Sequence, residues 1–372
     1  MKRRLNLRPI MTAAILALML VYQGTFAGEE TANPSSKAVD IAGINRSSRS
    51  EYLAYLKNHA ESPADYVISK FKAHDAVLLG EMHEIRENCE FVSQLIEPLY
   101  NKAGVRVIAT EFVRSRNTAR ANQLVTAREY DEDAALRIFR DYGQPWGFRE
   151  YIDILRAVWS FNRRLPPEAE KFHVLGLDSN WNECDVLFKL KDDAARLREY
   201  QRRERHMIRV FDKEVLTKRR KALVYLGYGH TFPEEKFGAV LRKKYGDRIF
   251  WVCLHHQQDG RLVGFLEGLF AENGNKPIGF DVVDSPFASL RDNTSPYFSS
   301  RKDLAFSQLA HGYVFLKPTA KLNRTTWVDG FVDKTNFESI RQIAVKRQWI
   351  NENECAGPAE LDSRMKQVFG SK

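Results

Sequence analysis

Residues 76–83 read Ala-Val-Leu-Leu-Gly-Glu-Met-His, a short apolar run that ends in a glycine, a carboxylate and an imidazole. Similar apolar runs return along the chain, separated by longer stretches whose apolar residues have helical spacing. Strands that alternate with helices in this way are typical of βαβ units. The sequence therefore predicts an α/β fold, with a mainly parallel central sheet flanked by helices and with helical insertions.

These patterns also place the elements along the chain. We expect strands at 76–79, 105–109, 172–177, 222–226 and 248–254, with further candidates at 277–280 and 313–316. Helices are expected at 89–102, 149–164 and 185–219, and a shorter one from Ser50. The organisation that follows is a flexible segment at 28–48 and one α/β domain over 49–372, with helical insertions near 114–164 and 185–219.

The first 27 residues have the pattern of a secretory signal peptide. A basic start, Met1-Lys-Arg-Arg4, precedes an uncharged apolar stretch from Ile10 to Tyr22, and Thr25-Phe-Ala27 is a small-residue cleavage site. The stretch is shorter than the roughly 20 residues of a membrane span. We therefore expect an exported, periplasmic or extracellular protein that meets a membrane only through an uncleaved signal.

Composition excludes several classes of protein. The chain of 372 residues is 44% hydrophobic, too much for intrinsic disorder, and four cysteines are too few for a disulfide scaffold. Those cysteines could form up to two disulfide bonds or stay unpaired: Cys89, Cys184, Cys253 and Cys355. The signal region supplies four of the nine net positive charges. No basic stripe interleaved with aromatic residues is present, which argues against a nucleic-acid partner.

Four predicted strands end in acidic or imidazole side chains. The carboxyl ends of parallel strands meet at one edge of a sheet, where open α/β folds bind their ligands. We therefore expect these side chains to gather in one cleft. They are Glu81, His83, Glu111, Asp178 and His230.

Two chemistries fit such a set. A carboxylate beside His83 would hold its tautomer and strengthen it as a base, so that it could deprotonate water for attack on an ester or amide. Alternatively, Glu81, His83, Glu111 and His230 could ligate a divalent metal. The sequence does not decide between the two.

Simpler structural roles are also open to some of these residues. Asp178 could cap a following helix, and Glu111 could pair with Arg114 or Arg116. Four nearby aromatic residues could pack in the core or wall a pocket: Tyr142, Trp146, Phe148 and Trp181. A GxSxG elbow, a Walker A loop and a GxGxxG fingerprint are all absent from the sequence.

The motifs themselves resemble those of a known superfamily. Leu78-Leu-Gly-Glu-Met-His83 followed by Val107-Ile-Ala-Thr-Glu111 is similar to the opening of the erythromycin esterase / ChaN / Tiki superfamily. Later segments resemble the esterase branch: Trp146-Gly-Phe-Arg-Glu150, Leu175-Gly-Leu-Asp178 and Leu226-Gly-Tyr-Gly-His230. The resemblance spans residues 75–231.

This resemblance implies an α/β core and three alternative functions. In the esterase branch, His83 would be the water-activating base, with Glu81, Glu111 and His230 lining the site. In the Tiki branch, similar positions would hold a metal for peptide cleavage, and a ChaN-like protein would bind haem for iron uptake without turnover. The leading expectation is an exported hydrolase of a small-molecule or peptide substrate. Its cofactor is none, a divalent metal or haem, and neither substrate identity nor oligomeric state is indicated.

Erythromycin esterases carry an extra residue between the Glu and the His, and Gly after the His. This chain lacks both features, because Met82 alone separates Glu81 from His83 and Glu84 follows. The resemblance therefore does not extend to macrolide hydrolysis.

Overall fold

The computed structural model of the chain describes residues 39–44, 46–180, 186, 190, 192–231, 236–256, 261–292 and 304–370. The expected signal peptide at 1–27 lies outside these residues, as do Cys184 and Trp181. No helix in the described ranges is long and apolar enough to cross a membrane.

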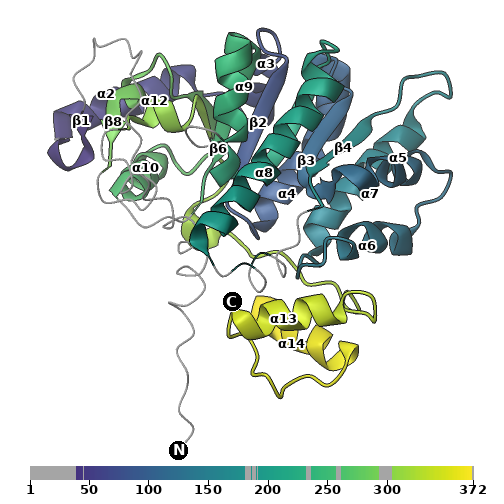
Figure 1. Cartoon of the computed structure of the whole chain (residues 1–372). Helices are drawn as coiled ribbons and strands as arrows, with labels where there is room; N and C mark the ends of the chain where they lie inside the picture. Colours follow the sequence, from purple (N-terminus) through teal and green to yellow (C-terminus); the bar gives the residue numbers. More distant parts are fainter. Residues whose placement is uncertain are drawn as a thin grey trace, which may run out of the picture.

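A seven-stranded sheet forms the centre of the described structure, in the order β4-β3-β5-β2-β6-β9-β7 (Figure 1). All neighbouring strands are parallel except β7 and β9, which pair antiparallel. The prediction of a mainly parallel sheet is thus confirmed. Its strands are β2 Ala76–Glu81, β3 Val107–Arg114, β4 His173–Asp178, β5 Ala222–Gly227, β6 Ile249–Leu254, β7 Ile278–Asp281 and β9 Gly312–Phe315.

Helices cover both faces of this sheet, which explains why its strands are continuously apolar. Successive residues of β2 point to opposite faces. Val77 and Leu79 therefore join one buried cluster, while Ala76 and Leu78 join a second. The two clusters are the two halves of the hydrophobic core.

The helices follow the predicted pattern, with the region 114–164 holding α5 to α7 and the region 185–219 holding α8. A π-helical turn, Asp212–Leu216, continues α8. The longer helices are α2 Arg46–His59, α3 Pro63–Lys70, α4 Arg86–Ala103, α5 Thr118–Thr126, α6 Glu132–Arg140, α7 Arg149–Arg164, α8 Asp193–Phe211, α9 Phe237–Tyr245, α10 Arg261–Glu272, α13 Phe337–Lys346 and α14 Pro358–Gly370. In Figure 1, α13 and α14 lie together, apart from the sheet.

The prediction of a flexible segment as far as residue 48 is wrong for its last part. Val39–Asp40 form β1, which pairs in parallel with β8, Leu290–Arg291. Ile41 is buried in the same cluster as Tyr52 of α2, and α2 begins at Arg46 rather than at Ser50. A single buried isoleucine in a polar stretch gives no periodic signal, so the sequence did not reveal this contact.

The described cysteines form no disulfide bonds. Cys89 and Cys253 are buried thiols, and Cys355 is a partly exposed one. Burial raises the pKa of all three thiols, which keeps them protonated and unreactive at neutral pH.

One glycine allows β4 to run close beside an irregular part of β3. The register of β3 against β4 shifts between Thr110 and Arg114. A Cβ on Gly176 would lie 2.4 Å from the backbone oxygen of Arg114 and 2.7 Å from that of Val113. Since backbone atoms cannot swing aside, glycine is required there for β4 to place Asp178.

We predict that Gly176→Ala lowers the free energy of unfolding by roughly 1–3 kcal/mol, the usual cost of overpacking a core. The matched control is Gly264→Ala in α10, where a Cβ meets nothing within 4 Å and alanine favours the helix. Urea unfolding of both variants tests this. Equal stability of the two variants would contradict the close packing of β3 on β4.

Candidate functional site

The structure brings the five predicted residues together at the carboxyl edge of four adjacent strands. Glu81 and Asp178 are the last residues of β2 and β4, and Glu111 lies within β3. His83 lies two residues beyond β2, and His230 ends the short 3-10 turn Tyr228–His230 after β5. Because β4, β3, β5 and β2 are neighbours in the sheet, these ends meet.

His83 and Glu81 form a hydrogen-bonded pair. Nδ1 of His83 lies 2.9 Å from Oε1 of Glu81, whose carboxylate is almost fully buried. Tyr151 donates to the same oxygen at 2.5 Å, and Tyr225 donates to Oε2. A carboxylate with these donors accepts the Nδ1 proton, which leaves Nε2 of His83 as the nitrogen with a lone pair.

The His83 ring lies against the backbone of β5. A Cβ on Gly227 would stand 2.6 Å from Cε1 of His83 and 2.9 Å from Nε2, so only glycine leaves room for the imidazole. The same Cβ would lie 3.0 Å from Oε1 of Glu111. His83 and Glu111 therefore meet over Gly227, and the side chain of His83 remains 31% exposed.

Electrostatics in this pair are set by burial and by the carboxylates. Burial opposes the charged form of His83, but the hydrogen bond to Glu81 and the negative charges of Glu111 and Glu81 outweigh it and raise the pKa of His83. Burial also raises the pKa of Glu81, against the hydrogen bonds from His83, Tyr151 and Tyr225. The two groups thus hold a proton between them more readily than either would in water.

Hydrogen bonds from two separate segments hold the turn that carries His83. Glu84 has a φ of 66°, a conformation that costs a residue with a side chain some energy. Its N–H donates to the Tyr151 hydroxyl at 2.9 Å, and its carbonyl accepts from the N–H of Thr325 at 3.0 Å. Asn323 and Arg324, from the segment after β9, also bind this turn. These bonds fix the direction in which His83 points.

Arg203 of α8 joins two buried carboxylates. Its Nη2 donates to Oε2 of Glu111 at 2.8 Å, and its Nε donates to Oδ1 of Asp178 at 2.8 Å. Tyr142 donates to the other oxygen of Asp178. Arg203 thus supplies a cation that pairs with Glu111. Asp178 also accepts from the N–H of Ser179 at 2.7 Å, and the segment in which it would cap a helix lies outside the described residues.

His230 is held by carboxylates at both of its ring nitrogens. Nε2 lies 2.9 Å from Oε2 of Glu111, and Nδ1 lies 2.6 Å from Oε1 of Glu204. Burial opposes a charge on this ring, but Glu111 and Glu204 raise its pKa to about 9. His230 is consequently an imidazolium at neutral pH, with no lone pair to act as a base.

The predicted set therefore divides into two kinds of residue. His83 and Glu81 form a pair that can exchange a proton with a substrate, whereas Asp178, Glu111 and His230 form a charged network around Arg203. Coulombic attraction to His230 and Arg203 overcomes the effect of burial and places the pKa of Glu111 well below its usual range.

The residues proposed as metal ligands do not fit a metal in this arrangement. Both nitrogens of His230 are bonded to carboxylates, and Glu111 is bonded to a guanidinium. Within the described ranges, no group of three or more His, Cys, Asp or Glu side chains is placed to hold a metal ion. Glu111 and His230 are thus already bonded to charged groups of the site itself.

Sequence reasoning missed four residues that bind this site, namely Tyr151, Arg203, Glu204 and Tyr225. For the residues of α8 a signal was present. Arg203 and Glu204 lie at helical spacing from the buried Met207 and Phe211, so two charged residues interrupt an inward face. A buried charge at such a position needs a partner.

Three of the four candidate pocket aromatics can be placed. Phe148 is buried in the core, and the hydroxyl of Tyr142 donates a hydrogen bond to Asp178. Trp146 is half-buried, and its ring meets that of His83 edge-on, with centroids 5.1 Å apart and planes at 88°. Phe112 stacks on Trp146 and packs on Tyr151.

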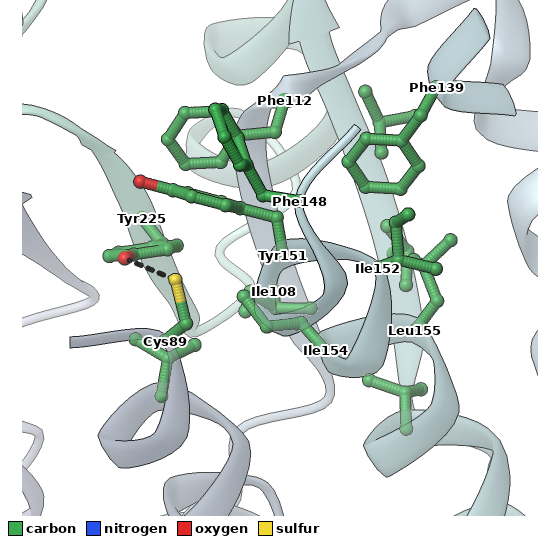
Figure 2. Packing of buried hydrophobic residues seen from close by; sticks show 14 of the residues in the cluster. Cys89, Ile108, Phe112, Phe139, Phe148, Tyr151, Ile152, Ile154, Leu155 and Tyr225 are labelled. Atoms are coloured by element: carbon green, nitrogen blue, oxygen red, sulfur yellow. Dashed lines mark hydrogen bonds between the residues drawn. The ribbon is translucent and has the colours of Figure 1, made fainter. Parts of the chain in front are cut away.

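Figure 2 shows Phe112, Phe148 and Tyr151 in the buried cluster, where the hydroxyl of Tyr225 also bonds Cys89 at 3.4 Å. The site therefore rests on a packed aromatic layer, and Trp146 borders His83.

Comparison with known proteins adds evidence for the fold. No protein-family model matches the sequence, and the search of curated proteins found no significant match. A succinoglycan biosynthesis protein of known structure is similar, with a TM-score of 0.56 and 10% identity over 76% of this chain and 99% of that one. At this identity the likeness shows a shared fold.

Two of the similar structures bear names from two of the three branches that the motifs resemble. A ChaN of Campylobacter jejuni with cofacial haem has a TM-score of 0.39 and 16% identity, over 52% of this chain and 86% of its own. An erythromycin esterase mutant in its open conformation has a TM-score of 0.40 and 13% identity, over 53% of this chain and 73% of its own. These two are too distant to indicate an activity.

The charge on His230 should appear in the pH dependence of stability. Its pKa is about 9 in the folded chain against 6.5 in a free side chain, so its stabilising effect is complete below pH 6.5 and lost as the pH rises through 9. A shift of this size corresponds to on the order of 3 kcal/mol. We predict that the free energy of unfolding falls between pH 6.5 and 9 in the wild type, and falls less in His230→Gln.

Chemical unfolding across this pH range measures the effect. The control is His59→Gln, which replaces an exposed histidine of α2. Parallel curves for the wild type and His230→Gln would show that His230 is not charged in the folded chain.

Proposed function

We propose that this chain is an exported hydrolase that cleaves an ester or amide bond with water activated by His83. Support for export comes from the signal-like residues 1–27. Support for hydrolysis comes from one observation above the others. Of the two histidines at the site, His83 alone has a carboxylate on one nitrogen only, and its side chain is also the more exposed, at 31% against 12% for His230.

The chemistry follows from the tautomer. Glu81 accepts the Nδ1 proton of His83, so Nε2 can take a proton from water as the water oxygen attacks the carbonyl carbon. The imidazolium that forms is stabilised by Glu81 and by the neighbouring Glu111. It then returns that proton to the leaving oxygen or nitrogen as the bond to carbon breaks.

The charged network would position this pair. Arg203 and His230 neutralise Glu111, so His83 lies beside a carboxylate that is already bonded by both cations and by the N–H of Gly227. Glu111 can therefore favour the imidazolium without itself taking the proton. His230 is a positioning residue in this scheme rather than a base.

The experiment is hydrolysis of a panel of aryl esters and anilides by the purified chain. We predict that His83→Ala lowers turnover by about 100-fold or more, the usual effect of a general base. The melting temperature should change little, because the imidazole is partly exposed. His59→Gln again serves as the matched control and should keep full activity.

Two results would contradict the proposal. One is unchanged turnover in His83→Ala. The other is a wild-type chain that hydrolyses nothing, with or without divalent metals, but develops a Soret band with haemin. The second result would favour the ChaN-like alternative of a haem-binding protein without turnover.

A further inference from the structure

The outer face of α8 carries a stripe of four arginines. Arg198, Arg202, Arg205 and Arg209 are separated by four, three and four residues, which places them on one face of a helix. After the first turn of α8, these four are its exposed residues. The helix lies in front of the sheet in Figure 1, and its buried residues, Glu204, Met207 and Phe211, face inward.

The described chain hardly neutralises this stripe. Arg198 lies 3.7 Å from Asp192, and Arg202 lies 3.5 Å from Glu199. These are long contacts between exposed groups, which contribute little. Within the described ranges, Arg205 and Arg209 have no salt bridge within 4 Å.

The folded chain gains nothing evident from the stripe. Like charges three or four residues apart destabilise a helix. The helix dipole favours a cation only near the last turn, which accounts for Arg209 but not for Arg198 or Arg202. An anionic partner outside the chain would offset this cost.

The stripe also lies on the helix that supplies two residues of the proposed active site. Arg202 directly precedes Arg203, whose guanidinium binds Glu111 and Asp178, and Glu204 binds His230. One face of α8 thus builds the site, while its outer face is cationic. A polymer bound along the stripe must therefore extend past the width of this helix, roughly 10–12 Å, to reach the site.

The shape and composition of the stripe restrict the partner. Its four charges extend over roughly 16 Å of helix, which suits an elongated polyanion better than a single phosphate. It offers no aromatic ring for stacking a nucleobase, and no apolar face for a lipid surface, because that face is buried in the core. A helix has no unpaired backbone groups for an acidic peptide strand. Guanidinium groups match the carboxylates and sulfates of a sugar polymer.

We propose that the arginine stripe of α8 binds an acidic polysaccharide and that this polymer is the substrate class of the site. The second half of this statement rests on the proposed hydrolase function. An acyl ester or an amide on such a polymer would then be presented to His83 while its acidic groups lie on Arg198, Arg202, Arg205 and Arg209.

The test is binding of the full chain to fluorescently labelled oligomers of uronic acid at low and physiological salt. We expect binding that weakens as salt rises, equally in the wild type and in His83→Ala. The fourfold variant R198Q/R202Q/R205Q/R209Q should bind roughly tenfold more weakly or worse, with an unchanged or higher melting temperature because the like-charge repulsion is gone. The comparison ligands are neutral dextran, single-stranded DNA, polyglutamate and phosphatidylglycerol vesicles.

The control variant removes four exposed cations elsewhere: K102Q/R137Q/R164Q/K366Q. It should bind the uronic acid oligomers as the wild type does. Equal loss in the control, no binding by the wild type, or tighter binding to DNA, polyglutamate or vesicles would overturn the assignment. So would a lower melting temperature of the stripe variant, which would reveal a structural role. If the chain bound the uronic acid oligomers but hydrolysed no ester or amide, the binding surface would be supported and the hydrolase function rejected. Failure of one proposal can therefore be told apart from failure of the other.

Discussion

The contact on which the site depends is that of Arg203 with Glu111 and Asp178. Both carboxylates are at most 3% exposed, and an uncompensated charge at such depth costs several kcal/mol. A single guanidinium binds both because it presents several donors in one plane, and His230 supplies a second cation to Glu111. The guanidinium also ties α8 to the carboxyl ends of β3 and β4. Without this cation, the acidic ends of adjacent strands would repel one another at the edge of the sheet.

The two histidines of the site differ in how many of their ring nitrogens are bonded to a carboxylate. Both lie beside carboxylates, and carboxylates raise the pKa of both. His230 has an acceptor at each nitrogen and is therefore locked in its charged form. His83 has one carboxylate acceptor, at Nδ1, so that Nε2 is the nitrogen left to exchange a proton in the proposed function. The number of acceptors, rather than the type of residue, decides which histidine can act as a base.

Much of the fold was readable from the sequence, and the reasons are physical. Strands buried on both faces are short apolar runs, so the seven strands of the sheet could be predicted from the sequence. The acidic or imidazole residues at the ends of four of them could be predicted as well. The residues that bind these acidic and imidazole side chains were not predicted. Arg203 and Glu204 lie on a helix rich in charge, and their spacing from Met207 and Phe211 indicates that they face inward without showing which groups they bind. Tyr151 and Tyr225 lie within apolar patterns, and only the structure shows that their hydroxyls meet Glu81.

The protonation of the two imidazoles is the central claim, and nitrogen-detected NMR titration of the histidine side chains measures it directly. Spectra of the wild type, with His83→Ala and His230→Gln to assign the signals, give the pKa and tautomer of each ring. We expect His230 to stay doubly protonated up to a pKa of about 9. His83 should titrate above 6.5, with the proton on Nδ1 in its neutral form. A His230 that loses its proton near 6.5, or a neutral His83 protonated on Nε2, would contradict this account of the site.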